Sequence, residues 1–188
     1  MAAGDTKLSI CSDALIMLGA APLSSFSDGT DEAQIADRLY DDIQDTILMQ
    51  YPYSWSVQKT GLSRFVDTPT NEWKYKFALP GDILGNPKAV FTTDAVGALP
   101  VREFEIYSGG LFANYESVWV DYQFRPEASA FPPYFVNLLK HALAAAFAEP
   151  ITDQITKADF YHKLAYGTLD QNMRGGMTRV ATNIHGGD

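Results

Sequence analysis

The chain has 188 residues, enough for one domain or for one domain with a sizeable insertion. Its residues are 46% hydrophobic and 13% aromatic, which is enough apolar material for a core and excludes a chain that is disordered throughout. Lys and Arg number 14 against 23 Asp and Glu, so the formal net charge is −9. A protein that grips duplex DNA normally carries a basic face, so this balance argues against an autonomous DNA binder. It does not exclude a protein that surrounds DNA without gripping it.

The N-terminal part predicts two helices. Apolar residues recur at steps of three and four over residues 7–18, and Gly19 can end this helix in the left-handed region. Thr30 can cap a second helix, which ends at Pro52 because a residue before proline is pushed out of the helical region. Four residues of the second helix, repeated every fourth position, are expected to face the core: Ile35, Leu39, Ile43 and Ile47.

Between residues 53 and 126 the apolar period changes to 2, which predicts strands. Apolar and polar residues alternate over 73–79 and 118–124, and Gly109-Gly110 offers a tight hairpin turn. We therefore expect an antiparallel meander of about five or six strands.

The helical pattern resumes after Pro132-Pro133, since proline is tolerated in the first helical turn. A third helix, rich in alanine, is expected over residues 134–149 and ends at Pro150. Thr152 or Asp153 caps a fourth helix, whose expected packing stripe is Ile155, Ala158, Tyr161, Ala165 and Leu169. The last stretch has four glycines and no periodicity, so we expect a tail that stays mobile until a partner orders it.

Together these elements predict an α+β fold, in which a bundle of two N-terminal and two C-terminal helices carries an inserted antiparallel β module. The predicted divisions are N-terminal helices at 1–52, a β-rich insertion at 53–130, C-terminal helices at 131–174 and a flexible tail at 175–188. We see no secretory signal and no apolar run long enough to span a membrane. The single cysteine, Cys11, excludes an internal disulfide framework and is expected to be a buried side chain in a reducing compartment.

No catalytic motif is evident in the sequence. It contains neither a G-x-S-x-G elbow nor a glycine-rich phosphate loop. Asp159 and His162 could share a helical face and bind a metal, but a surface ion pair is the simpler interpretation, so we predict no metal site and no cofactor. A cluster of aromatic residues could form a base-stacking platform, but such platforms normally lie in basic grooves, and the lysines of this sequence are few and scattered. We therefore expect these aromatic residues to pack in the core: Tyr51, Tyr53, Trp55, Trp73 and Tyr75.

Paired carboxylates are candidates for a catalytic site, because two of them at a suitable separation are enough for glycoside cleavage. Asp37, Asp41 and Asp45 form a stripe on the second helix, and Glu103 and Glu105 share one strand face. Acids are abundant in this chain, so such pairs arise by chance. We interpret the stripe as solvated or as facing a neighbouring subunit or a channel.

Four stretches, in this order, resemble a known family. They are the opening helix with its proline turn (14–23), the acidic helix running into Tyr51-Pro52-Tyr53-Ser54-Trp55-Ser56, the aromatic strand ending in Leu79-Pro80-Gly81-Asp82, and a late alanine-rich helix followed by a long final helix. Over residues 8–173 the pattern is similar to the head-to-tail adaptor (connector) proteins of tailed phages, of the tail tubular protein A type. Residues from Gly175 onward match no pattern of that family.

This resemblance implies a structural virion protein with no catalytic site. It implies a ring, commonly a dodecamer, that docks beneath the portal of a DNA-filled capsid, extends the DNA channel and receives the next tail component. The implied partners are the portal protein, the next tail or nozzle protein, further copies of the chain, and genomic DNA that passes without specific binding, with no membrane involved. The protein would be made in the host cytoplasm and located in the virion neck. Repeated around a ring, a charge of −9 per chain would repel the phosphate backbone.

We expect the tail to dock on the portal through apolar anchors and charged contacts, namely Arg174, Met177, Arg179, Val180 and Ile184. An inert end is the alternative. A rival function is a virion-associated polysaccharide or peptidoglycan hydrolase, which would need a groove with two carboxylates about 5–10 Å apart, one of them desolvated. A small regulatory or scaffolding protein unrelated to virions is a third possibility.

Overall fold

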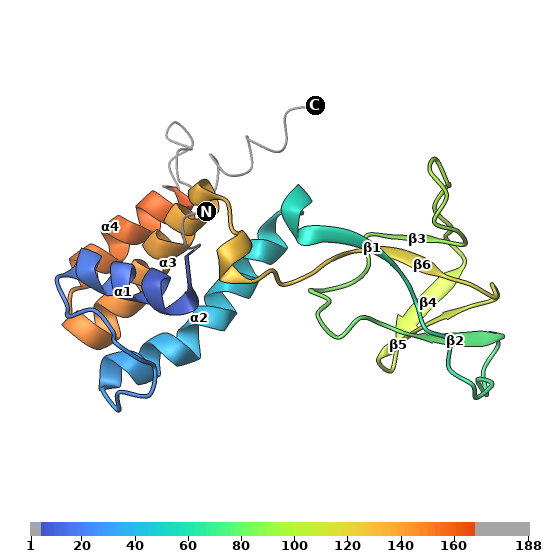
Figure 1. Cartoon of the computed structure of the whole chain (residues 1–188), viewed down its shortest axis with the longest axis horizontal. Coiled ribbons are helices and arrows are strands. Elements are labelled where there is room, and N and C mark those ends of the chain that lie inside the picture. Colours follow the sequence, from blue (N-terminus) through green and yellow to red (C-terminus); the bar gives the residue numbers. More distant parts are fainter. Residues whose placement is uncertain (1–4, 168–188) are drawn as a thin grey trace. The chain divides into compact units, whose positions relative to one another are not determined.

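The computed structural model describes residues 5–167, which form two compact units (Figure 1). The helical unit combines residues 5–53 with 126–167, and the β unit spans 54–125. The helical unit contains α1 (Lys7–Leu18), α2 (Asp31–Gln50), α3 (Pro133–Thr152) and α4 (Ile155–Tyr166). Since an antiparallel β unit lies between the second and third helices in the chain, the predicted α+β fold is confirmed. None of the helices within residues 5–167 is long and apolar enough to cross a membrane.

Local capping explains where α1 and α2 begin. The Thr6 hydroxyl accepts from the backbone N–H of Ser9, and the Ser9 hydroxyl accepts from that of Thr6, which forms a reciprocal capping box. Gly19 ends α1 with φ 83°, a left-handed conformation that suits glycine. Thr30 caps α2 by accepting from the N–H of Ala33 at 3.2 Å.

The buried face of α2 differs from the one the sequence predicted. Ile47 is fully buried, whereas Ile35, Leu39 and Ile43 are only half-buried. The fully buried positions follow a neighbouring line of the helix: Ala33, Ala36, Tyr40, Gln44 and Leu48. The sequence prediction used only the largest aliphatic side chains, whereas this line also includes two alanines, a tyrosine and a glutamine. Ile35, Leu39 and Ile43 therefore lie at the edge of the core, and Ile47 lies inside it.

The end of α3 and the start of α4 also differ from the prediction. α3 continues through Pro150, although proline has no N–H to donate to the carbonyl of Ala146, so the proline does not end the helix. The helix ends at Asp153, which has φ 53° and donates its N–H to the carbonyl of Glu149 at 3.1 Å. Gln154 then precedes α4 without a side-chain cap, so the predicted cap was wrong. In the predicted packing stripe Ala165 is buried, Ile155 is 69% exposed, and Leu169 lies outside the described residues.

Two hydrogen bonds connect α4 to the end of α1. Lys157 Nζ donates to the carbonyl of Leu18, and the Tyr161 hydroxyl donates to that of Met17, both at 2.8 Å. They satisfy carbonyls that have no partner within α1, and they place a cation at the negative end of its dipole. An ion pair of 2.7 Å between Lys140 and Asp13 joins α3 to α1. These contacts link helices from opposite ends of the chain.

The β unit consists of two three-stranded antiparallel sheets. One has the order β1 (Val57–Gly61), β6 (Trp119–Gln123), β3 (Ala89–Phe91), and the other has β2 (Tyr75–Ala78), β5 (Gly110–Ala113), β4 (Phe104–Tyr107). The predicted meander is wrong, because only β4 and β5 are neighbours both in sequence and in a sheet. The buried core of the unit comprises Phe77, Val90, Leu111, Ala113, Val118, Val120 and Tyr122.

The β4–β5 hairpin turns one residue earlier than predicted. Ser108 and Gly109 both have positive φ, of 48° and 69°, as a type I′ turn requires. Gly110 is the first residue of β5 and lies under the Lys76 side chain, which would be 2.6 Å from an added Cβ.

Candidate docking groove of the helical unit

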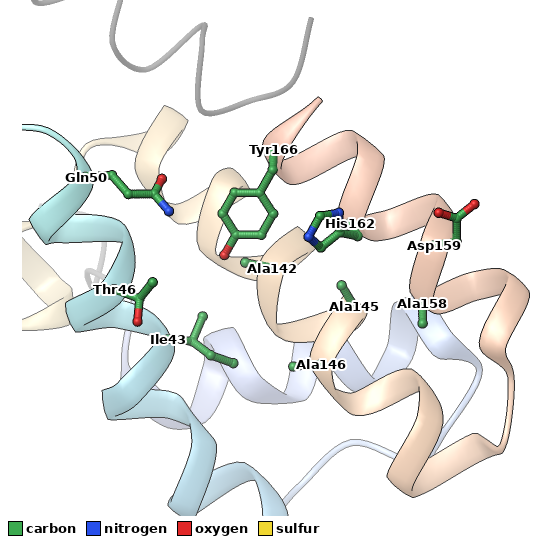
Figure 2. Close-up of a pocket in the computed structure, with 10 residues that line it drawn as sticks. All are labelled: Ile43, Thr46, Gln50, Ala142, Ala145, Ala146, Ala158, Asp159, His162 and Tyr166. Carbon is green, nitrogen blue, oxygen red and sulfur yellow. The ribbon is translucent and has the colours of Figure 1, made fainter. Parts of the chain in front are cut away.

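Three helices of the helical unit surround an open groove of about 620 Å³. Its floor is an alanine face of α3, and its walls are one side of α2 and one side of α4 (Figure 2). The lining residues are Ala142, Ala145 and Ala146 on the floor, Ile43, Thr46 and Gln50 on α2, and Ala158, Asp159, His162 and Tyr166 on α4. In Figure 2, Gln50 and Tyr166 reach from opposite walls across the end of the groove near Ala142.

The sequence of α3 explains why the groove exists. Both α2 and α4 pack on α3, and the floor between them carries only methyl groups. The α2 wall follows steps of three and four residues from Ile43 to Gln50, a length of about 11 Å at 1.5 Å per residue. The α4 wall runs from Ala158 to Tyr166, a length of about 12 Å. The groove therefore has the length of about two helical turns.

The polar groups of the groove do not form a catalytic set. Asp159 pairs with Lys163 on its own helix, while the ring of His162 lies 4.9 Å from that of Tyr166. Burial raises the pKa of the Tyr166 hydroxyl, so the phenol stays protonated near neutral pH. Within residues 5–167, no group of three or more His, Cys, Asp or Glu could hold a metal ion. The lining suits an apolar polypeptide segment better than a small polar substrate.

The acidic stripe of α2 is partly neutralised by Lys7. Lys7 Nζ lies 3.0 Å from a carboxylate oxygen of Asp37 and 3.5 Å from one of Asp41. Burial opposes the charge on Lys7, but the two carboxylates outweigh it and raise the pKa of the ammonium group. Asp45 is half-buried on the next turn. That the stripe faces a subunit or a channel stays a prediction.

The other carboxylate pair lies on an exposed edge of the β unit. Glu105 accepts a hydrogen bond of 3.3 Å from the Trp73 indole, and Glu103 accepts one of 3.5 Å from the Tyr115 hydroxyl. Both glutamates are exposed. Neither therefore has the desolvated environment that a general acid for glycoside cleavage needs.

The aromatic residues proposed as core are divided between the two units. Tyr53 is fully buried in the helical unit, and its ring lies 5.4 Å from that of Phe135 in an edge-to-face arrangement. Trp73 and Tyr75 are half-buried in the β unit. The core interpretation therefore holds for Tyr53.

The tail residues proposed for portal docking lie outside the part of the chain that the structure describes: Arg174, Met177, Arg179, Val180 and Ile184. The groove itself was missed from sequence. The alanines of α3 were its only signal, since a row of methyl groups on a helix allows neighbouring helices to pack closely around it. Thr46, Gln50 and Tyr166 stand out only once the three helices are assembled.

Comparison with known proteins adds no identification. Neither the models of protein families nor the curated protein sequences match this chain.

Proposed function

We propose that this protein is a structural head-to-tail adaptor of a tailed phage. It forms a ring, dodecameric as in the family that it resembles, below the portal, where it extends the DNA channel and docks the next tail component. The observation that carries the proposal is the order of elements, with two helices, an antiparallel β insertion and two further helices along one chain. This order coincides with the sequence stretches that resemble the adaptor family.

The surface of the helical unit supports a role in protein contacts. Besides the groove, it exposes large apolar side chains on three helices, Ile16 (54% exposed), Met49 (59%) and Phe160 (56%), and methionine and aromatic residues are enriched at protein interfaces. A ring subunit needs two different contact surfaces, because head-to-tail interfaces join unlike faces of neighbouring copies. Apolar residues on several helices are consistent with such contacts.

The charge of the chain supports a channel through which DNA slides. The helical unit carries 13 Asp and Glu against 5 Lys and Arg within its described residues. A wall of this sign repels phosphates and offers DNA no basic groove in which to stick. Lys7 reduces the charge of the α2 stripe without reversing it.

Imaging of assembled phage particles by cryo-electron microscopy, at a resolution that traces this chain, tests the proposal. We expect a ring of copies between the portal and the next tail protein. Mass spectrometry of purified particles provides a simpler check, and absence of the chain from particles would refute the adaptor function.

The hydrolase hypothesis has its own test, a zymogram on cell-wall and capsular polysaccharide with the purified full chain. We expect no clearing. Clearing that is lost in Glu105→Gln would replace the adaptor proposal with an enzymatic one.

A further inference from the structure

The groove has an apolar surface that is partly exposed, and the chain leaves α4 next to it. Ile43 of α2 lines the groove and is half-buried, and the floor between α2 and α4 carries only methyl groups. Tyr166 both lines the groove and is the last residue of α4. The chain that follows Gly167 therefore starts at one end of the groove.

The sequence downstream contains a segment that matches the groove in length and pattern. Residues 177–185 lie between two Gly-Gly pairs, which separate them from the flanking chain. Within them, apolar residues occur at i, i+3, i+4 and i+7, the pattern of helices that bind in grooves: Met177, Val180, Ala181 and Ile184. A helix of this length would be about 13 Å long, against walls of about 11 and 12 Å.

Chain length and charge favour docking within one chain. Nine residues separate Gly167 from Met177, and they can span up to about 30 Å, more than twice the length of the groove. Arg174 and Arg179 are the only Lys, Arg, Asp or Glu residues between Asp170 and Asp188. The helical unit that offers the groove is strongly acidic, so its field attracts this segment.

We propose that residues 177–185 bind in the groove of their own chain as a two-turn amphipathic helix. Met177, Val180 and Ile184 then lie over the alanine floor, and Arg179 faces solvent near the acidic surface. The proposal goes beyond the adaptor function and does not depend on it. Combined with that function, it has the consequence that the portal must compete with the groove for the same apolar anchors.

A disulfide between engineered cysteines in the full chain tests the proposal. Ala145→Cys places a thiol on the groove floor, and Val180→Cys places one at the centre of the segment. The matched control pairs Val180→Cys with Ile16→Cys, since Ile16 is 54% exposed on α1 and does not line the groove. Native Cys11 does not interfere, because burial raises the pKa of its thiol to about 12.

With oxidised glutathione as oxidant, we expect an intrachain disulfide that forms about tenfold faster in the groove pair than in the control pair, because docking raises the effective concentration of the two thiols. Met177→Asp together with Ile184→Asp should reduce the rate of the groove pair to that of the control. Equal rates in the two pairs would overturn the proposal. So would disulfides that join two chains at a concentration-dependent rate, because the occupant would then be a second copy.

Hydrogen exchange provides a second measurement without new cysteines. In the full chain we expect amides of residues 177–185 to be protected, and the Met177→Asp/Ile184→Asp variant to lose that protection. Unprotected amides in the unsubstituted chain would count against docking. Both experiments use the isolated protein, so a negative result would refute groove docking and would not affect the proposed adaptor function. Conversely, absence of the chain from phage particles would refute the adaptor function and would not affect groove docking.

Discussion

The hydrogen bond from Tyr161 to the end of α1 gives the most direct test of how the helical unit is held together. Tyr161→Phe removes one hydroxyl and keeps the ring, which lies 6.0 Å from the ring of His141. The Met17 carbonyl, which accepts from that hydroxyl at 2.8 Å, then loses its partner from α4. A half-buried hydrogen bond of this kind contributes about 1 kcal/mol to the free energy of unfolding. With a urea dependence of about 1–2 kcal/mol/M, the unfolding midpoint should fall by about 0.5–1 M.

The assay can separate the two units, because all three tryptophans belong to the β unit: Trp55, Trp73 and Trp119. Circular dichroism at 222 nm follows mainly the helices, whereas tryptophan fluorescence follows the β unit. We expect Tyr161→Phe to shift only the circular dichroism midpoint. The matched control is Tyr115→Phe, which removes a hydroxyl whose contact is a 3.5 Å hydrogen bond to an exposed glutamate. An unchanged helical midpoint, or an equal shift in fluorescence, would refute the role of this bond in the helical unit.

Three further predictions follow from local features of the two units. Cys11 is buried with a thiol pKa raised to about 12 by burial, so Ellman's reagent should modify it only after denaturation. Burial lowers the pKa of His141, so the neutral ring is favoured in the folded state, and stability should fall as the pH drops below the unfolded value of about 6.5. His141→Gln should flatten that dependence in urea titrations at several pH values. Gly109→Ala should destabilise the β unit by about 1 kcal/mol, because φ is 69° at that position, as measured by tryptophan fluorescence.

Each of these predictions has an outcome that contradicts it. Rapid labelling of Cys11 in the native protein would mean that α1 opens readily. An unaltered pH profile in His141→Gln would mean that another group titrates. For the turn, Gly81→Ala is the control, since Gly81 has open space around its Cα and no positive φ. An equal loss of stability in Gly81→Ala and Gly109→Ala would show that backbone strain is not the cause.

The starts of α1 and α2 were predictable because their signals are local. Thr6 and Thr30 each act on a backbone N–H three residues ahead, and Gly19 acts on its own backbone angles. The passage of α3 through Pro150 was not predictable in this way. Pro150 lies inside α3, which ends two residues later at Thr152, so the proline by itself does not mark the end of the helix.

Long-range pairing limited the prediction of the β unit and of the groove. β1 pairs with β6, so Val57 lies opposite Gln123, and no local pattern distinguishes this arrangement from a meander. The groove depends on three helices at once. Ile43 is half-buried because the alanines opposite it on α3 are too short to cover it, and a hydrophobic stripe read along α2 alone does not reveal this.

The hydrogen bonds from α4 to α1 also constrain the order in which the chain folds during synthesis. Lys157 reaches back 139 residues to Leu18, and Tyr161 reaches back 144 residues to Met17. At about 5–20 residues per second, a ribosome needs about 7–30 s to make the chain between these partners. The entire β unit is made before α3 and α4 and can fold first. Until α3 and α4 are made, the apolar faces of α1 and α2 that pack against them stay exposed. A nascent chain whose β unit has left the ribosome while α3 and α4 have not would therefore expose the apolar faces of α1 and α2, and a chaperone would be needed at that stage.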